Sequence, residues 1–371
     1  MMKEIVKKLR CPISNNRLHE LNEQEVRDIN DKIKNKELVS YEIGTSIEII
    51  LEEALVDESG KYYYPIIDGI FFLLKDHAIV GKDSVMDSET SAVEKIKMEN
   101  RSFYDDKGWE DVDGDFEDAV LFEDLRDISK NYINKCHDRF GEIINQGGEF
   151  IVDVASGPIQ YDKYIEYHKN FDKRVCVDFS ISALKQAKKK IGDKGIYVLG
   201  DITNMPFLDN SMDSVISLHT VYHVPKKEQI IAFHEINRIT KQGNKSAVIY
   251  SWGNHAFFMN LFLFPRQLLR IIKVSLISIL YWGRNAHKKA NTSRGLYFYS
   301  YKRRHLVKQL NFNFDITVWR SVSVPFMRFY IQKFLLGKAI LRCIYKLEQS
   351  FPHFMGKIGQ YPVFIINKED L

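Results

Sequence analysis

The chain has 371 residues, of which 45% are hydrophobic and 27% charged, with 24 Phe and 19 Tyr but only 9 Pro. This composition excludes a disordered or collagen-like chain and provides enough apolar material for a folded core. The four cysteines form no C-x-x-C pair, which argues against a disulfide framework or a thiolate zinc site and favours a cytoplasmic protein.

Charge is divided unevenly along the sequence. Residues 254–371 hold 19 Lys and Arg against 4 Asp and Glu, whereas residues 1–253 hold 34 against 45. A basic C-terminal third with many aromatic residues predicts an anionic partner, either a phosphate-bearing acceptor or an anionic membrane surface. The alternative is a solvated basic exterior. The acidic run over residues 102–127 either faces this third or forms a solvated linker.

Residues 1–80 predict a small, separate β-rich module, in which Pro65 and the pair Asp68-Gly69 indicate a tight turn between two apolar runs. The module resembles the zinc-ribbon-like domain that precedes many bacterial methyltransferases. Ser14 stands at the second cysteine position of that pattern, so the resemblance implies a degenerate module without zinc. The matching residues are Cys11, Pro12, Leu18, Tyr64, Pro65, Ile66, Asp68, Gly69, Ile70 and Leu74.

The polar stretch over residues 81–117 predicts a linker, and residues 118–371 are expected to form the main domain. Apolar residues at spacings of three and four predict an amphipathic helix over 118–145. Five strand and helix patterns then alternate up to residue 252, with Ser180 as the expected cap of one helix. This alternation predicts an α/β fold with a doubly wound sheet, whose ligands bind at the carboxyl ends of the strands.

The order of motifs in this region resembles the S-adenosylmethionine-dependent class I methyltransferases. The motifs are VDVASG at 152–157, CVDFS at 176–180, GDITNMPF at 200–207 and SMDSVISLHTVYHV at 211–224. The resemblance implies a seven-stranded Rossmann-like sheet and S-adenosylmethionine as cofactor. In the family's acidic-x-Gly-x-Gly-x-Gly motif, Asp153 and Gly157 match, whereas Ala155 and Ile159 replace two glycines.

The resemblance also implies the roles of the cofactor-binding residues. Asp153 would hold the cofactor's amino group directly or through water, and Asp178 would bind the ribose hydroxyls. Phe179 would pack on the adenine, and Asp201 would accept from its exocyclic amine beside the Ile202 amide. The complete predicted set is Asp153, Ala155, Ser156, Gly157, Asp178, Phe179, Asp201, Ile202 and Leu218.

Methyl transfer to a hydroxyl requires a base, and His219, Tyr222 and His223 lie at the end of the fourth predicted strand. We expect His223 to be the base, with His255 as a reserve candidate. The alternative for each histidine is a hydrogen bond to the loop backbone. No metal is expected, because the stretch after this strand supplies no Asp/Asn pair of ligand type.

The basic third predicts helical insertions at about 255–296 and 324–358, separated by strands at 311–323 and 361–368 that complete the seven-stranded sheet. In the first insertion, basic residues Arg266, Arg270 and Lys273 interrupt an apolar stretch. The ten residues without charge after Lys273 are too few to span a bilayer. The insertions are therefore either core or lid helices or interfacial helices on anionic lipid.

These features predict an S-adenosylmethionine-dependent methyltransferase that O-methylates a sugar or small metabolite, in a surface glycan pathway. We expect it in the cytoplasm, in part at the inner face of the membrane. An RNA methyltransferase is the first alternative and is less favoured, because no N-P-P-Y-type motif follows the fourth strand. The second alternative is an inactive methyltransferase-like protein that binds a membrane surface.

Overall fold

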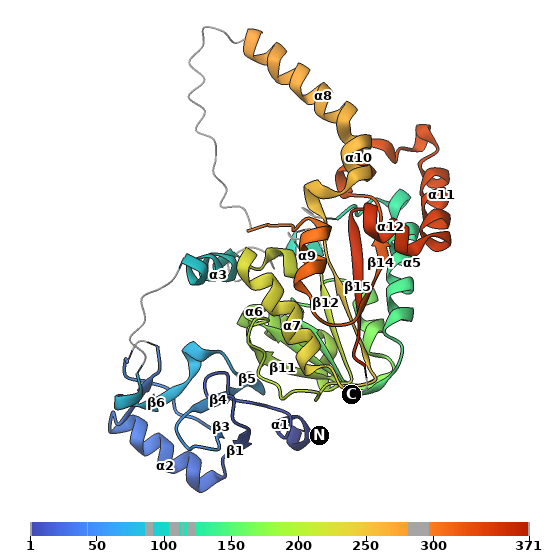
Figure 1. Cartoon of the computed structure of the whole chain (residues 1–371). Helices are drawn as coiled ribbons and strands as arrows, with labels where there is room; N and C mark the ends of the chain where they lie inside the picture. The colour runs from blue at the N-terminus through green and yellow to red at the C-terminus, as the bar shows by residue number, and fades with distance from the viewer. Residues whose placement is uncertain are drawn as a thin grey trace.

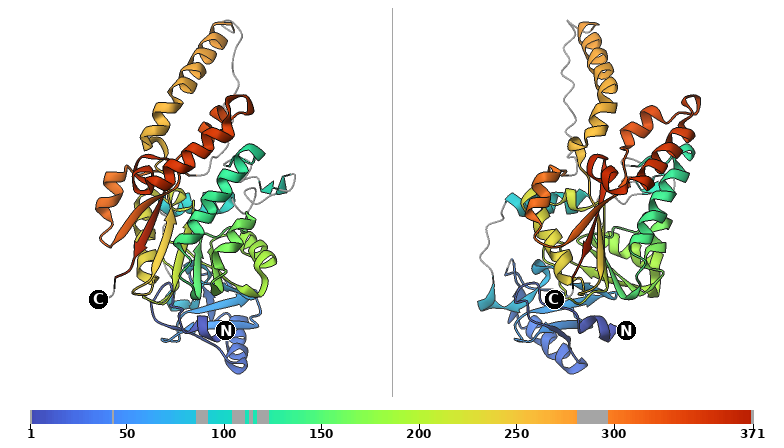
Figure 2. Two further views of the ribbon diagram at one scale, coloured as in Figure 1. Left: turned by 90° about the vertical axis from the view of Figure 1, so that its right-hand side faces the viewer. Right: turned by 45° about the vertical axis from the view of Figure 1, so that its right-hand side comes forward.

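The computed structural model describes residues 2–42, 44–85, 92–103, 111–112, 115–116, 123–280 and 297–369. A central sheet runs through the molecule, and helices cover it on two sides (Figure 1). The helix η4 and α5 lie on one side of the strands, and α7 and α9 lie on the other (Figure 2). Their bounds are η4 Asp162–His168, α5 Asp127–Ile143, α7 Gln229–Ile239 and α9 Arg303–Gln309.

Seven strands of the sheet follow the order β11-β10-β9-β12-β13-β15-β14. The first five are parallel, and β15 is antiparallel to both of its neighbours. This arrangement confirms the predicted doubly wound seven-stranded sheet. The bounds are β9 Gly148–Val154, β10 Phe171–Asp178, β11 Gly195–Leu199, β12 Ser214–Leu218, β13 Lys245–Ile249, β14 Phe314–Arg320 and β15 Tyr361–Asn367.

The helix α6 (Ile181–Ile191) connects β10 to β11. Its first turn is capped as predicted, because the Ser180 side chain accepts a hydrogen bond from the Ala183 amide. Short helices occupy the other connections of this region: η5 Gly192–Lys194, η6 Val221–His223, η7 Lys226–Glu228 and η8 Gly253–His255.

The first 80 residues are rich in strands, as predicted, and the turn between β4 and β5 has positive φ at Asp68 and Gly69. The separate module at residues 1–80 stays a prediction, and its strands join the main sheet. β5 pairs in parallel with β11, so the sheet continues into this region and the edge of β11 is covered. The elements are α1 Met2–Val6, β1 Leu18–Glu20, α2 Glu23–Lys34, β2 Leu38–Ser40, β3 Glu53–Asp57, β4 Tyr63–Ile67, β5 Ile70–Phe72, η1 Lys75–His77, β6 Ile79–Gly81 and η2 Lys82–Ser84.

Hydrogen bonds hold the loops of this region where the resembled pattern has its metal ligands. The Cys11 sulfur accepts from the Ser14 amide at 3.3 Å and lies 3.3 Å from the Tyr64 hydroxyl. The buried Asp57 carboxylate accepts from the Ser14 and Ser59 hydroxyls and from two backbone amides. Across the described ranges, no cluster of three or more His, Cys, Asp or Glu side chains has the arrangement of a metal site.

The stretch expected to be a linker contains the helix α3 (Ala92–Phe103) and a short hairpin of β7 (Asp111–Val112) with β8 (Asp115–Phe116). The helix predicted over residues 118–145 begins only at Asp127, as α5, and residues 117–122 lie outside the described part. The end of the acidic run does contact the basic third, because Glu123 pairs with Arg320 of β14.

Helices occupy both stretches in which insertions were expected. The long helix α8 projects away from the sheet, and the turn between α10 and α11 rises at the same end of the molecule (Figures 1 and 2). Within the described residues, no helix combines the length and hydropathy needed to cross a bilayer. The bounds are α8 Phe257–Leu280, α10 Val324–Tyr330, η9 Lys333–Leu335, α11 Gly337–Ser350 and α12 Pro352–Ile358.

Replacing Gly356 with Ala tests the packing of α12 on β14. A Cβ atom at this position would lie 2.2 Å from the Thr317 carbonyl oxygen, so the helix would have to move. We expect a loss of about 1–3 kcal/mol in the free energy of unfolding, measured by urea denaturation. Gly81→Ala is the control, because no atom lies within 4 Å of its added Cβ. Equal stability of the two variants would contradict this packing.

Candidate active site

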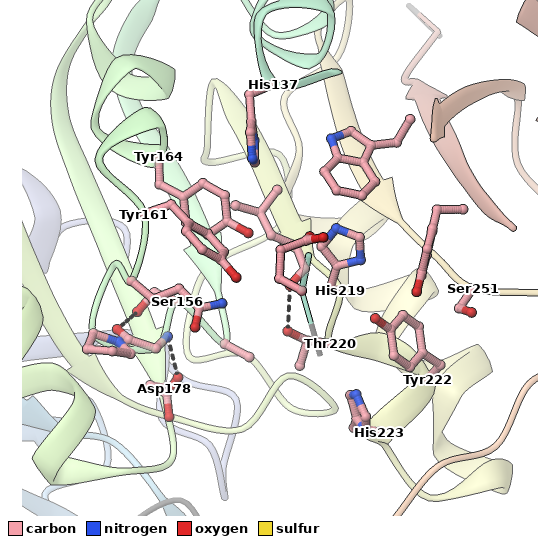
Figure 3. Close-up of a pocket in the computed structure, with 18 of the residues that line it drawn as sticks. His137, Ser156, Tyr161, Tyr164, Asp178, His219, Thr220, Tyr222, His223 and Ser251 are labelled. Carbon is pink, nitrogen blue, oxygen red and sulfur yellow. Dashed lines mark hydrogen bonds between the residues drawn. The ribbon is translucent and has the colours of Figure 1, made fainter. Parts of the chain in front are cut away.

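A cavity of about 260 Å³ lies at the carboxyl ends of β9, β10 and β12. Figure 3 shows Ser156 and Asp178 on one side, Tyr222 and His223 on the other, and His219 between them. The lining residues come from β9 to η4, from the ends of β10 and β12, and from β14 and β15. They include Ala155, Ser156, Gly157, Gln160, Tyr161, Tyr164, Asp178, Phe179, Leu218, His219, Thr220, Tyr222, His223, Trp319, Arg320 and Tyr361.

The loop after β9 has an unusual backbone. Ala155, Gly157 and Ile159 have φ values of 54°, 57° and 58°, all in the left-handed region. These are the three positions at which the resembled motif has glycine. A left-handed conformation is strained for alanine and more so for a β-branched residue such as Ile159, whose side chain is fully buried. The loop therefore keeps a glycine-type path although two of the glycines are replaced.

Asp178, at the end of β10, faces this loop. One carboxylate oxygen accepts from the Gly157 amide at 2.9 Å, and the other accepts from the Ser180 amide at 2.9 Å. The carboxylate is 5% exposed and lines the cavity, so a ligand in the cavity can reach it. Phe179, Leu218 and Ser156 also line the cavity, which brings these predicted cofactor-binding residues together.

Asp153 lies outside the cavity lining, so its predicted contact with the cofactor's amino group stays a prediction. It forms a fully buried ion pair with Arg174 of β10, whose Nε donates to the Asp153 carboxylate at 3.1 Å. Arg174 also donates to the Tyr164 carbonyl in η4. The pair therefore fixes η4, which places the rings of Tyr161 and Tyr164 in the cavity wall.

Asp201 and Ile202 also lie outside the lining of the cavity. The Asp201 carboxylate lies 2.7 Å from the ammonium group of Lys97 in α3 and accepts from the Thr203 hydroxyl at 2.7 Å. Lys97 also pairs with Glu228 at 2.9 Å. An adenine amine at Asp201 would have to share or displace the Lys97 contact, so this predicted role remains a prediction.

The three predicted catalytic residues all line the cavity. His223 Nδ1 lies 2.8 Å from the Tyr297 carbonyl oxygen. Because a carbonyl can only accept, Nδ1 carries the proton and Nε2 keeps its lone pair. Burial lowers the pKa of His223 to about 4, so the ring is neutral near pH 7. The reserve candidate His255 lies in η8 and does not line the cavity.

His219 is half-buried, packs against aromatic rings and lines the cavity. Its ring centroid lies 4.4 Å from that of Trp319 and 5.3 Å from that of Tyr361. Burial, together with the nearby positive charge of Arg320, lowers the pKa of His219 well below its ordinary value. His219 has a φ of 62°, a strained value for a non-glycine residue that turns the chain out of β12 into the cavity wall.

The far side of the cavity contains residues that sequence reasoning missed. Trp319 and Arg320 come from β14, and Tyr361 comes from β15. Arg320 is 1% exposed and donates to Glu123 at 2.5 Å, with its guanidinium 4.7 Å from the Trp319 ring centroid. Burial opposes its charge, but the Glu123 carboxylate raises the pKa of Arg320, so it stays protonated.

Several residues that line the cavity carry buried polar atoms that have no hydrogen-bond partner within the described part of the chain. Two are donors on the β14 side, Nε of Arg320 and Nε1 of Trp319. Two can accept, Oε1 of Gln160 in the loop after β9 and Nε2 of His219 after β12. Leaving such atoms unpaired costs free energy, about 1–3 kcal/mol each. A ligand that both accepts and donates hydrogen bonds would therefore satisfy these atoms.

Comparisons with known proteins agree with this architecture. Residues 152–248 match the family model described as a methyltransferase domain. This part of the chain is a methyltransferase domain. It is the part that contains the loop after β9, Asp178 and the three predicted catalytic residues.

The methyltransferase domain is similar to parts of several curated proteins. A demethylmenaquinone methyltransferase of Renibacterium salmoninarum is 32% identical over 102 residues, which cover 27% of this chain and 40% of the relative. A sterol 24-C-methyltransferase of Gibberella zeae is 38% identical over 65 residues, covering 18% and 16%. The chain spans 40% and 38% of the lengths of the first two curated relatives.

A solved structure from Methanococcus maripaludis, assigned as an S-adenosylmethionine-dependent methyltransferase, is 21% identical to this chain. The match covers 66% of this chain and 90% of that protein, with a TM-score of 0.35.

Replacing Ala155 with Gly tests the strained loop. Glycine adopts positive φ freely, so the substitution relieves backbone strain in the folded protein. This gain should offset the destabilisation that comes from the greater conformational entropy of glycine in the unfolded chain. We expect the free energy of unfolding to stay unchanged or to rise by up to about 1 kcal/mol. The control is Ala232→Gly within α7, where the same change should cost about 1 kcal/mol or more. Equal losses in urea denaturation would contradict a left-handed Ala155.

The buried histidines predict how stability depends on pH. Burial lowers the pKa of His137 to about 3 and of His168 and His223 to about 4, whereas an unfolded histidine has a pKa of about 6.5. The unfolded chain therefore binds more protons between these values, so stability present above pH 6.5 is lost as pH falls towards 4.

Urea denaturation at a series of pH values measures this loss. His168→Gln removes one of the titrating groups and should make the loss between pH 6.5 and 4 shallower. A wild-type profile that is flat over this interval would contradict the neutral, buried state of these histidines.

Proposed function

We propose that the protein transfers a methyl group from S-adenosylmethionine to a hydroxyl group of a small polar acceptor, of which a sugar is the favoured class. One observation carries the proposal. A single cavity is lined on one side by the strained loop and Asp178 and on the other by a neutral histidine and unpaired polar atoms. The first side suits the cofactor, and the second suits a hydroxylated acceptor.

The residues of the first side fit the cofactor chemically. Ala155 and Gly157 line the cavity with left-handed backbone and small or no side chains, which allows close approach of a ligand. The Asp178 carboxylate stands at a strand end, where it can accept from two vicinal ribose hydroxyls. Phe179 and Leu218 add apolar surface for the adenine ring of the cofactor. When bound, S-adenosylmethionine supplies a methyl group on a positively charged sulfur.

His223 supports the choice of a hydroxyl acceptor. Its Nδ1 is held by the Tyr297 carbonyl, so Nε2 is the atom that accepts a proton from the acceptor hydroxyl. A pKa of about 4 keeps this ring neutral near pH 7, so Nε2 carries no proton there.

The second side of the cavity favours a neutral, hydroxylated compound over a phosphate. Among the residues described as lining it, the basic side chain is Arg320, whose charge is balanced by Glu123. A hydroxyl group on this side can accept a hydrogen bond from Arg320 Nε or from Trp319 Nε1. The rings of Tyr161, Tyr164 and Trp319 provide flat apolar surface for the carbon face of a sugar.

Titration calorimetry with S-adenosylmethionine and with S-adenosylhomocysteine tests the proposal. We expect wild-type binding in the micromolar range and a loss of about 100-fold or more in Asp178→Ala, because the ribose loses a charged acceptor. Asp172→Ala is the matched control, since Asp172 is exposed on the same strand β10, away from the cavity.

A tritium-labelled methyl group then identifies the acceptor among sugar nucleotides, lipid-linked glycans and RNA. The proposal predicts label in a hydroxylated small molecule that disappears when the hydroxyl is replaced by hydrogen. The proposal is contradicted if the folded wild-type protein binds neither S-adenosylmethionine nor S-adenosylhomocysteine. It is also contradicted if the label appears in RNA alone.

A further inference from the structure

An exposed apolar surface lies at one end of the molecule. We call it the apolar end and define it by residues of α8 and of the turn before α11. Both project beyond the sheet at the same end (Figures 1 and 2). The residues are Phe257, Leu261, Phe264, Leu268 and Ile271 in α8, with Phe334, Leu335 and Leu336 in the turn.

The α8 residues of the apolar end form one stripe. Their spacing of four, three, four and three residues places them on a single face of the helix. Each is between 47% and 66% exposed, although Phe, Leu and Ile are normally buried when they recur at this spacing. The packed side of α8 is different, because Met259 is 4% exposed and Leu263 packs against the core. The stripe is thus an amphipathic face without a partner in the described chain.

The turn adds a second apolar contact. Phe334 and Leu336 are 82% and 73% exposed, which are high values for such large side chains. Leu336 has a φ of 53°, so the backbone is strained where it turns into α11. At the same end of the molecule as the stripe, these side chains add to the exposed apolar area, which exceeds that of scattered surface residues (Figure 2).

Exposed basic residues accompany the apolar end. Arg266 lies on the side of α8 opposite the stripe, Lys333 and Lys338 flank the turn, and Arg342 and Lys346 continue along the exposed face of α11. From residue 254 to residue 347, the sequence has Asp315 as its sole acidic residue. An apolar stripe bordered by cations is complementary to a surface that offers acyl chains below a layer of negative charge.

We propose that the apolar end docks on an anionic lipid bilayer, with α8 lying in the interface and the Phe334 turn inserted beside it. No helix in the described ranges could cross the bilayer, so the contact is peripheral. A second copy of this chain is a poorer occupant. Pairing through this end would bring together the C-terminal regions of two copies, and residues 254–371 of each copy carry 19 basic and 4 acidic residues.

Docking would place the active site near the lipid. α8 follows η8 directly after β13, so it leaves the sheet at the carboxyl ends of the parallel strands, where the cavity lies. The docking surface itself is independent of methyl transfer and would be present in a catalytically inactive protein.

Vesicle flotation with the full chain tests the proposal. The probes are vesicles of phosphatidylcholine alone and of phosphatidylcholine mixed with phosphatidylglycerol. We expect binding to the mixed vesicles that weakens as salt is added, with little binding to the neutral ones. Wild-type protein that floats with neither vesicle, or equally with both, overturns the proposal.

Two sets of variants assign the binding to the apolar end. Combining Phe264→Ser, Leu268→Ser and Ile271→Ser should lower the partition coefficient about tenfold or more, because it removes three large apolar side chains. The matched control is Ile49→Ser with Ile50→Ser, residues that are 49% and 83% exposed in the N-terminal region. Unchanged unfolding midpoints show that the exposed substitutions leave the fold intact.

The second set tests charge by combining Lys338→Glu, Arg342→Glu and Lys346→Glu. We expect this variant to lose the preference for anionic vesicles, whereas Lys32→Glu with Lys34→Glu in the distant helix α2 should keep it. If the serine variant binds vesicles like wild type, the proposal fails. It also fails if wild type forms a dimer that the serine variant abolishes while neither protein binds lipid.

Discussion

The path of the backbone between β9 and η4 is the constraint on which the site depends. Three left-handed residues, at positions 155, 157 and 159, bend the chain sharply over the ends of the parallel strands. The Ser156 amide donates to the Val177 carbonyl at 3.2 Å, and the Gly157 amide donates to Asp178 at 2.9 Å. These bonds tie the turn to the end of β10. Asp178 thus has a structural role in the loop and remains open to the cavity.

The opposite wall is held by buried polar contacts between distant parts of the sequence. Glu123 binds Arg320, and Glu348 of α11 accepts from the Tyr132 hydroxyl of α5 at 2.7 Å and from the Ser321 amide at 2.7 Å. Buried charges of this kind contribute little net stability, but removing one partner is costly. Their effect is to fix β14 and α11 relative to α5, so that Trp319 and Arg320 face the cavity.

The sequence allowed much of the fold to be predicted. Alternating strand and helix patterns predicted a doubly wound sheet, and the cap at Ser180 and the turn at Asp68 follow local rules of turn chemistry. Local rules do not report which strand edges meet. The pairing of β5 with β11, which joins the N-terminal region to the main sheet, was therefore not predicted.

The candidate site was predictable only in part, for a related reason. Motif order predicted Asp178, His219 and His223 as site residues, and all three line the cavity. Asp178 ends β10, His219 directly follows β12, and His223 lies in η6. Trp319 and Arg320 belong to a strand about 100 residues later and carry no motif, so pairing of β14 with β15 alone brings them to the cavity. Arg174 forms an ion pair with the Asp153 carboxylate. This contact joins adjacent strands, and no spacing in the sequence predicts it.

The central claim is that one cavity holds the cofactor against the loop after β9 and the acceptor against the β14 wall. A crystal structure of the protein with S-adenosylhomocysteine tests it most directly. The account predicts ribose hydroxyls on the Asp178 carboxylate and the sulfur atom directed towards His219 and His223. A nucleoside bound elsewhere, or bound in the cavity without contact to Asp178, would contradict the account.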